Sequence, residues 1–214
     1  YIEELRNLPS KQRKRFFSGE YVSDVEGALW SLDMIEAGRV SEAPEMRRIV
    51  VAVDPSGADS AEDELSDEIG ISVCGLGYDG HGYVLADRTL RASPAGWARA
   101  AVTAFNEFSA DKLIGERNYG GAMVESTIKS ADRSVSVTLV TASRGKHIRA
   151  EPIAGLYEAT PDRGPQVHHV GRFPDLEDEM LNFSIHGYQG DRSPNRADAM
   201  VFGLTELMLG QPRT

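Results

Sequence analysis

The stretch RRIVVAVDPSG, residues 47–57, decides the architecture of this chain. Its apolar run, Ile49 to Val53, has no polar interruption and stops at Asp54, after which a proline and a glycine follow. A short apolar run bounded by turn residues is typical of a strand that is buried in a sheet. The stretch therefore predicts a buried strand over residues 47–54 that places a carboxylate at its carboxyl end.

The rest of the chain alternates between strand and helix patterns. Two strands joined by the turn YDGHG are expected within residues 68–90 as an antiparallel hairpin. We predict two more strands, at 111–116 and 136–143, and a short extended piece at 166–171. We also predict five helices, at 94–109, 120–131, 145–159, 174–183 and 193–209. Ser93 and Ser193, each followed by a proline, are predicted to cap their helices. This order predicts an α/β protein with a mixed five-stranded central sheet flanked by helices.

Composition limits the class of protein. The chain has 214 residues, of which 41% are hydrophobic, which is enough for one sizeable core. No apolar run approaches the roughly 18 residues that cross a bilayer, and no signal peptide pattern occurs, so we expect no membrane partner. The single cysteine, Cys74, excludes a disulfide framework and a multi-cysteine metal site, and its apolar surroundings predict a small buried hydrophobe. We expect an intracellular protein.

The charges are segregated along the chain. A net charge of −10 argues against a nucleic-acid-binding protein if the charge is evenly spread. Residues 54–68 contain seven acids and no base, however, whereas basic residues gather at 11–15 and 143–149. This separation is compatible with a cation site beside a polyanion, although a solvated surface explains any one charge run equally well.

Two of the predicted strands end in a carboxylate. Asp54 ends the first strand and Glu116 ends the strand at 111–116. Right-handed crossovers place these strands side by side and parallel, and ligands bind at the carboxyl ends of such strands. Because neighbouring strands lie about 4.8 Å apart, the two carboxylates could share a divalent cation. Asp198, in the first turn of the last predicted helix, supplies a third acid.

The donor set of these three acids points to a particular kind of metal. Hard oxygen donors without a histidine–cysteine set favour Mg²⁺ or Mn²⁺ over Zn²⁺. Two such ions roughly 4 Å apart could hold the attacking water and the leaving oxygen of a phosphodiester. Each acid alone is more simply explained as a cap, turn or surface residue, so the hypothesis depends on the order of the elements that carry them.

Six segments carry a family resemblance, in the order VVAVDPSG, EIGISVCGLG, GERNYGG, SRGKHIRAEPIAGLYE, VHHVGRFPDLEDEMLNF and SPNRADAMVFGLTELML. Together, over roughly residues 1–210, they resemble the nuclease domain of tailed-phage terminase large subunits, the DNA-packaging motors. The resemblance implies a ribonuclease H-like fold, and it implies metal-binding, catalytic carboxylates at Asp54, Glu116 and Asp198. The chain departs from the pattern at Asn195, where many relatives have an acid, so one accessory carboxylate is missing.

The resemblance also implies a function and partners. Such large subunits carry an N-terminal ATPase, but this chain has no G-x-x-x-x-G-K-[ST] motif, so we expect no nucleotide site. We interpret residues 1–46 as a helical lead-in from a missing ATPase domain and residues 47–214 as the nuclease domain. The implied activity is metal-dependent cleavage of concatemeric double-stranded viral DNA during genome packaging, with two Mg²⁺ or Mn²⁺ ions, in the host cytoplasm. The implied partners are the DNA, the ATPase domain, the small terminase subunit and the portal.

Other polar residues receive less specific roles. Arg144, Lys146 and Arg149 follow a strand near the predicted metal end of the sheet and could bind DNA phosphates, with a solvated helix start as the alternative. Asp67 and Asn118 are accessory candidates, for which a surface role and a loop-closing role are the alternatives.

His168 and His169 are adjacent, so on a strand they face opposite ways, and we interpret them as structural. We interpret Trp30 and Trp97 as packing residues.

Two other functions stay open. One is a junction resolvase or transposase-like nuclease on the same fold, which would prefer four-way junctions to linear duplex. The other is a catalytically silent module that binds DNA or a portal ring, which would lack a divalent-ion stabilisation that depends on the acids.

Overall fold

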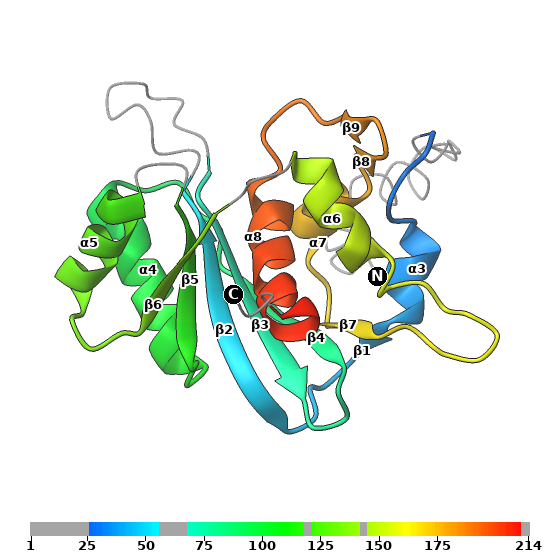
Figure 1. The fold of residues 1–214 in the computed structure, drawn as a ribbon, viewed down its shortest axis with the longest axis horizontal. Coiled ribbons are helices and arrows are strands. Elements are labelled where there is room, and N and C mark those ends of the chain that lie inside the picture. Colours follow the sequence, from blue (N-terminus) through cyan, green and yellow to red (C-terminus); the bar gives the residue numbers. More distant parts are fainter. Residues whose placement is uncertain (1–25, 56–67, 118–120, 142–144, 211–214) are drawn as a thin grey trace, which may run out of the picture.

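The computed structural model describes residues 26–55, 68–117, 121–141 and 145–210. Within these ranges one sheet has seven strands in the order β1-β7-β4-β3-β2-β5-β6 (Figure 1). Its strands are β1 Arg39–Val40, β2 Met46–Asp54, β3 Gly70–Gly77, β4 Gly82–Asp87, β5 Lys112–Glu116, β6 Val137–Val140 and β7 Val167–Val170. Two short strands, β8 Phe183–Ser184 and β9 Gly187–Tyr188, pair separately as a hairpin.

Helices flank this sheet, which confirms the predicted α/β class. They are α3 Leu32–Ala37, α4 Pro94–Glu107, α5 Gly121–Ala131, α6 Lys146–Ala154, α7 Pro174–Met180 and α8 Asn195–Leu204, which a π-helix η1, Thr205–Leu209, continues. Ser93 occupies the N-cap position of α4, but its side chain makes no capping hydrogen bond. The predicted cap at Ser193 is wrong, because α8 begins after Pro194 and the serine Oγ accepts a hydrogen bond from Lys146 Nζ at 2.9 Å.

The predicted strand pairing is confirmed around β2, and the predicted number of strands is too low. β3 pairs antiparallel with both β2 and β4, whereas β5 lies parallel to both β2 and β6. The two additional strands are β7, which corresponds to the predicted extended piece, and β1, which pairs parallel with β7. A strand of two residues is too short to show a hydrophobic period, so the sequence pattern does not reveal β1.

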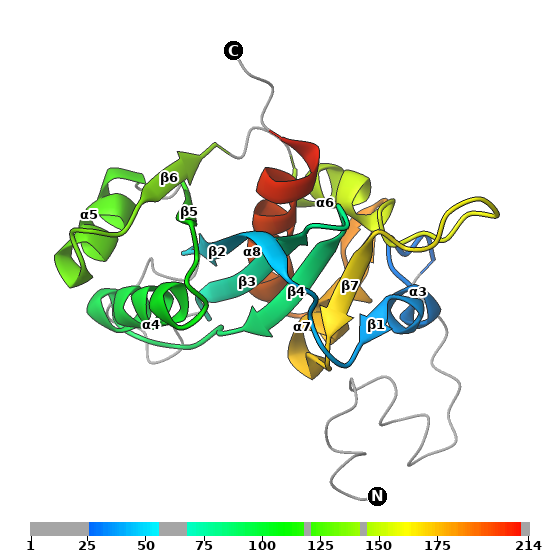
Figure 2. The same cartoon turned by 90° about the horizontal axis from the view of Figure 1, so that it is seen from below.

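Both faces of β2 are buried, as its apolar run predicts. Val51 and Val53 pack in a cluster that includes residues of α4 and α5, whereas Val50 and Ala52 pack in a second cluster with residues of α6, α7 and α8. Figure 2 shows α4 and α8 on opposite sides of β2 and β3. A strand buried on both faces is rigid, so the residue at its end has a fixed position.

Two glycines let α8 lie directly on β2 and β3. A Cβ on Gly70 would be 1.9 Å from the backbone oxygen of Asn195, and a Cβ on Gly203 would be 2.9 Å from the Sγ of Cys74. Cys74 is fully buried, as predicted. This close contact fixes the start of α8 against the start of β3.

Part of the predicted lead-in packs against the same fold. Trp30 is fully buried, with its ring edge-on to Tyr157 and Phe183, and Trp97 is buried among residues of the other cluster, so both are packing residues. Residues 1–25 lie outside the described residues, and the division at residue 46 stays a prediction. Among the described residues, no helix is long and apolar enough to span a bilayer.

Candidate active site

Asp54 and Glu116 lie side by side at the carboxyl ends of two parallel strands. β2 and β5 pair in parallel with Val53 opposite Gly115, so the next residue of each strand is one of the two acids. Asp54 is fully buried and Glu116 is 8% exposed. Burying two carboxylates next to each other is costly unless a positive charge compensates them.

Asp198 joins these two acids from the first turn of α8. It is fully buried, on a helix that contacts both β2 and β3. The pKa of Glu116 is raised, first by burial, then by the negative charge of Asp54, with a further contribution from Asp198. The three carboxylates therefore belong to one electrostatic site.

Two bases of α6 contact Asp198 directly. Lys146 Nζ lies 2.5 Å from one carboxylate oxygen, and Arg149 Nη2 lies 3.2 Å from the other. The guanidinium of Arg149 also stands over the ring of Phe202, with 4.9 Å to the centroid. The positive charges of Arg149 and Lys146 partly offset the rise in the pKa of Glu116. Both bases thus lie at the carboxylates, as a phosphate-binding role requires, but they bind an acid of the site itself.

The oxygen donors of this site fit a divalent cation, but the three carboxylates are not close enough together to hold one as they stand. Three buried carboxylates from separate elements supply hard oxygen donors, and a cation among them would favour their ionised forms. Within the described ranges, no group of three or more His, Cys, Asp or Glu side chains is close enough to hold an ion as it stands. Lys146 and Arg149 supply the positive charge at Asp198 instead.

Three predicted site residues fall outside the described part of the chain. Asp67, Asn118 and Arg144 lie there, and the structure therefore describes nothing of their surroundings. Their accessory and DNA-binding roles stay predictions.

A family model for the terminase RNaseH-like domain matches residues 51–207. The chain belongs to this family. The resemblance to terminase nuclease domains and the predicted ribonuclease H-like fold are thereby confirmed. No curated protein sequence matches the chain.

Solved structures agree with the family in fold. The large terminase nuclease from thermophilic phage G20c matches with a TM-score of 0.60 at 13% identity, over 84% of this chain and 98% of that one. The nuclease domain of the large terminase subunit gp2 of bacterial virus Sf6 gives 0.58 at 16%, over 83% and 98%. The HK97 bacteriophage large terminase gives 0.55 at 12%, over 83% of this chain and 43% of that one. A mutant of the Sf6 domain has been solved with manganese and with calcium. At these identities the likeness shows the fold alone.

In this terminase domain the start of α8 is held by a set of charged residues that the sequence pattern does not reveal. Pro194 cannot cap the helix with a side chain, and instead Glu179 of α7 accepts a hydrogen bond from the backbone N–H of Ala197 at 3.0 Å. Arg196 forms ion pairs with four carboxylates from outside the helix, those of Glu68, Asp87, Asp175 and Glu179. No local sequence signal reveals these contacts, because all four acids are distant from α8 in the chain.

Burial acts strongly on the acid that caps α8. It raises the pKa of Glu179 to about 7, and the hydrogen bond from Ala197 and the charge of Arg196 only partly oppose this. The position of Asp198 therefore depends on a carboxylate whose charge changes near neutral pH.

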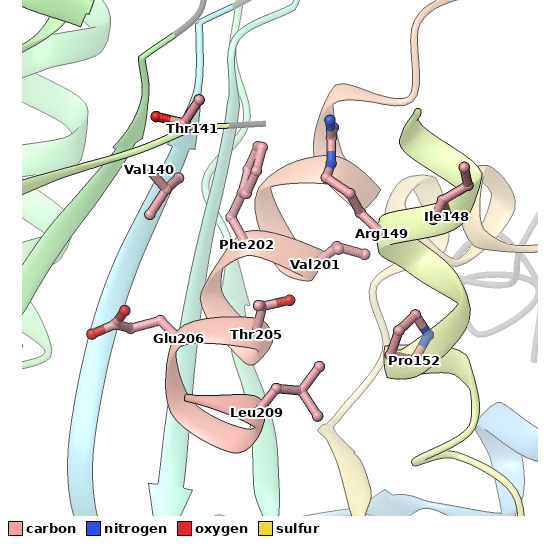
Figure 3. Close-up of a pocket in the computed structure, with 10 residues that line it drawn as sticks. All are labelled: Val140, Thr141, Ile148, Arg149, Pro152, Val201, Phe202, Thr205, Glu206 and Leu209. Atoms are coloured by element: carbon pink, nitrogen blue, oxygen red, sulfur yellow. The ribbon is translucent and has the colours of Figure 1, made fainter. Parts of the chain in front are cut away.

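A cavity of about 230 Å³ adjoins the carboxylate site of the terminase domain (Figure 3). Arg149 belongs to both, because it pairs with Asp198 and also lines the cavity. The other walls are mainly apolar, and the one acid among them, Glu206, is paired with Arg48 at 2.8 Å and Lys112 at 3.0 Å. Because the charge of Glu206 is offset by its two partners, the charged group that connects this cavity with the carboxylate site is Arg149.

Proposed function

We propose that this terminase domain is a divalent-metal-dependent endonuclease that hydrolyses phosphodiester bonds of double-stranded viral DNA. One observation carries the proposal: three buried carboxylates, Asp54, Glu116 and Asp198, come from two strand ends and a helix start to one site. Family membership and the manganese bound to the Sf6 domain support it. Buried carboxylates repel one another, and a bound cation would remove this repulsion.

The three acids would hold the metal. Asp54 and Glu116 offer oxygens from rigid strand ends, and Asp198 offers oxygens from the first turn of α8. When bound, two Mg²⁺ or Mn²⁺ ions supply an activated water and stabilise the charge on the leaving oxygen. Glu116 must be ionised to serve as a ligand, so its raised pKa makes cation affinity increase with pH.

Lys146 and Arg149 have a role that changes with the state of the site. Without metal they form ion pairs with Asp198, and these pairs link α6 to α8. With metal and DNA present, the same two cations would instead hold phosphates of the strand that is cut. Asp198 would thus exchange Lys146 and Arg149 for the metal ions as its positive partners.

Family membership supports a proposal for the biological setting. We propose that the domain cuts concatemeric DNA during genome packaging in the host cytoplasm, with the ATPase domain, the small terminase subunit and the portal as partners. This chain covers 43% of the large terminase of HK97, which supports a domain that works as part of a longer protein.

Cleavage of supercoiled plasmid DNA tests the proposal. We expect homogeneous protein to cut with Mg²⁺ or Mn²⁺ and to stop with a chelator. Asp198→Asn keeps the size of the side chain but loses the charge, so it should cut far more slowly. The matched control is Asp191→Asn at an exposed position before α8, which should cut normally.

Four results would contradict the proposal. Cation-independent cutting excludes the metal site, and normal cutting by Asp198→Asn excludes that acid. A folded wild-type protein that binds DNA without ever cutting it would indicate a silent binding module. A strong preference for four-way junctions over linear duplex would indicate a resolvase instead.

A further inference from the structure

Two histidines meet on the sheet away from the carboxylate site. His81 lies just before β4, in the turn that follows β3, and His168 lies on β7. His81 Nδ1 is 2.8 Å from His168 Nε2, the ring planes differ by 8°, and the centroids are 5.1 Å apart. The distance between the two ring centroids exceeds the distance between the two nitrogens by about the width of one imidazole ring. The rings therefore lie edge to edge in nearly one plane. Their nitrogen lone-pair positions therefore point at one another.

His168 is fixed in the orientation of a metal ligand. Its Nδ1 is 3.0 Å from the carbonyl oxygen of Gly38, and only a protonated Nδ1 can donate to that oxygen. Its ring also lies against the ring of Tyr83, with 5.1 Å between centroids and 27° between planes. Because Nδ1 holds the proton, Nε2 presents a lone pair. A second hydrogen bond of this kind to a backbone carbonyl is what orients histidine ligands in metal sites.

Asp79 adds negative charge beside the pair. One of its oxygens accepts from the backbone N–H of His81 at 3.0 Å, and the other accepts from the hydroxyl of Tyr83 at 2.6 Å. Both histidines interact with its charge. Burial lowers the pKa of His168, which favours the neutral form that binds metals.

We propose that His81 Nδ1 and His168 Nε2 bind a transition-metal ion of the Zn²⁺ class. The ion takes the place of the proton between the two nitrogens, and His81 carries that proton on Nε2 instead. Imidazole nitrogens favour Zn²⁺, Cu²⁺ or Ni²⁺, whereas the carboxylate site favours Mg²⁺ or Mn²⁺, so the two sites take different ions. Zinc–nitrogen bonds of about 2.0–2.1 Å in tetrahedral geometry require the nitrogens to separate by roughly half an ångström. They also require the His81 ring to turn, so that the two lone pairs converge on the ion instead of pointing at one another. His81 is partly exposed in a turn and can make this movement, and water completes the coordination.

The bound ion would tie three parts of the chain together. It would link the β3–β4 turn to β7, and through the carbonyl of Gly38 it would link both to the end of α3. With two protein ligands the site should be weaker than a four-ligand structural zinc site. Since the ion binds the folded chain, it should raise the melting temperature in a concentration-dependent way.

Titration of the tag-free protein with Zn²⁺ tests this inference. Calorimetry is done in excess Mg²⁺, with the wild type, His81→Gln, His168→Gln and, as control, His186→Gln at an exposed position in the β8–β9 turn. We expect one zinc site in the wild type and in the control, and at least about a tenfold loss of affinity in each of the other variants. Thermal melting should show a zinc-dependent rise that the same two variants lose.

Two outcomes overturn the inference. The first is a wild type that binds no Zn²⁺, and the second is zinc binding that His81→Gln leaves unchanged. Because His81 is in a turn and glutamine keeps a polar side chain there, this variant decides the test even if His168→Gln fails to fold. In NMR spectra of the wild type, zinc should shift the ring nitrogens of His81 and His168 and leave those of His186 in place.

Discussion

Replacing Gly70 with alanine should disable the site without touching any carboxylate. Gly70 pairs with Asp54 across the β2–β3 ladder, and an added Cβ would lie 1.9 Å from the backbone oxygen of Asn195, the first residue of α8. Real Cβ contacts essentially never fall below 3.0 Å, so the start of α8 must retreat by at least about 1 Å. Asp198 is three residues further along the helix and would move with it.

Two magnitudes follow from this displacement. Overpacking of a tight interior typically costs about 1–3 kcal/mol of folding stability, so the variant should still fold but melt at a lower temperature. A displacement of about 1 Å in catalytic geometry can reduce the rate about 10²-fold, and we expect a loss of that order for metal-dependent DNA cleavage. DNA affinity should change less, because Lys146 and Arg149 are on α6.

The assay compares plasmid cleavage and thermal melting for Gly70→Ala and Gly164→Ala. The control position has no atom within 4 Å of an added Cβ, so this variant should keep both wild-type activity and stability. Full activity in folded Gly70→Ala would mean that the position of α8 does not govern the site.

Other changes give separate predictions. Between pH 4.5 and about 7 the folded wild-type protein binds more protons at Glu179 than the unfolded protein does, so its free energy of unfolding falls as pH rises. Urea titrations of Glu179→Gln should lack this fall, so that its free energy of unfolding gains about 3 kcal/mol relative to wild type across the range. The exposed control Glu158→Gln should show no such gain. Charge removal at Lys146 or Arg149 should weaken DNA binding and reduce its salt slope by up to about one unit per lost contact, and an unchanged slope would count against a phosphate role. Asp54→Ala should abolish cleavage while the metal-free protein keeps or gains thermal stability, because one of several like charges is gone; normal cutting would contradict this.

The sequence predicts the central strand of the sheet because its local apolar pattern agrees with its burial in the folded protein. The run Ile49 to Val53 is apolar on both faces, and the structure buries the strand on both faces. The positions of Asp54 and Glu116 follow from strand ends and right-handed crossovers alone. By contrast, the two-residue β1 contains no period to detect, and its strand conformation comes from pairing with β7.

The environment of Asp198 shows what local patterns leave out. Ser193 followed by a proline has the signature of a helix start, but α8 begins two residues later and takes its cap from Glu179 on α7. The basic stretch after β6 likewise indicates cations near the site, but not that Lys146 and Arg149 bind Asp198. These contacts depend on how helices pack, which spacing along the chain does not encode.

A crystal structure of the protein soaked in Mn²⁺, with anomalous difference maps, shows directly whether the three carboxylates bind the metal. We expect manganese peaks among Asp54, Glu116 and Asp198, with the Asp198 carboxylate turned from Lys146 toward the metal. Manganese at another place in crystals of active protein, or a carboxylate site that stays free of manganese at concentrations that support cleavage, would contradict this expectation.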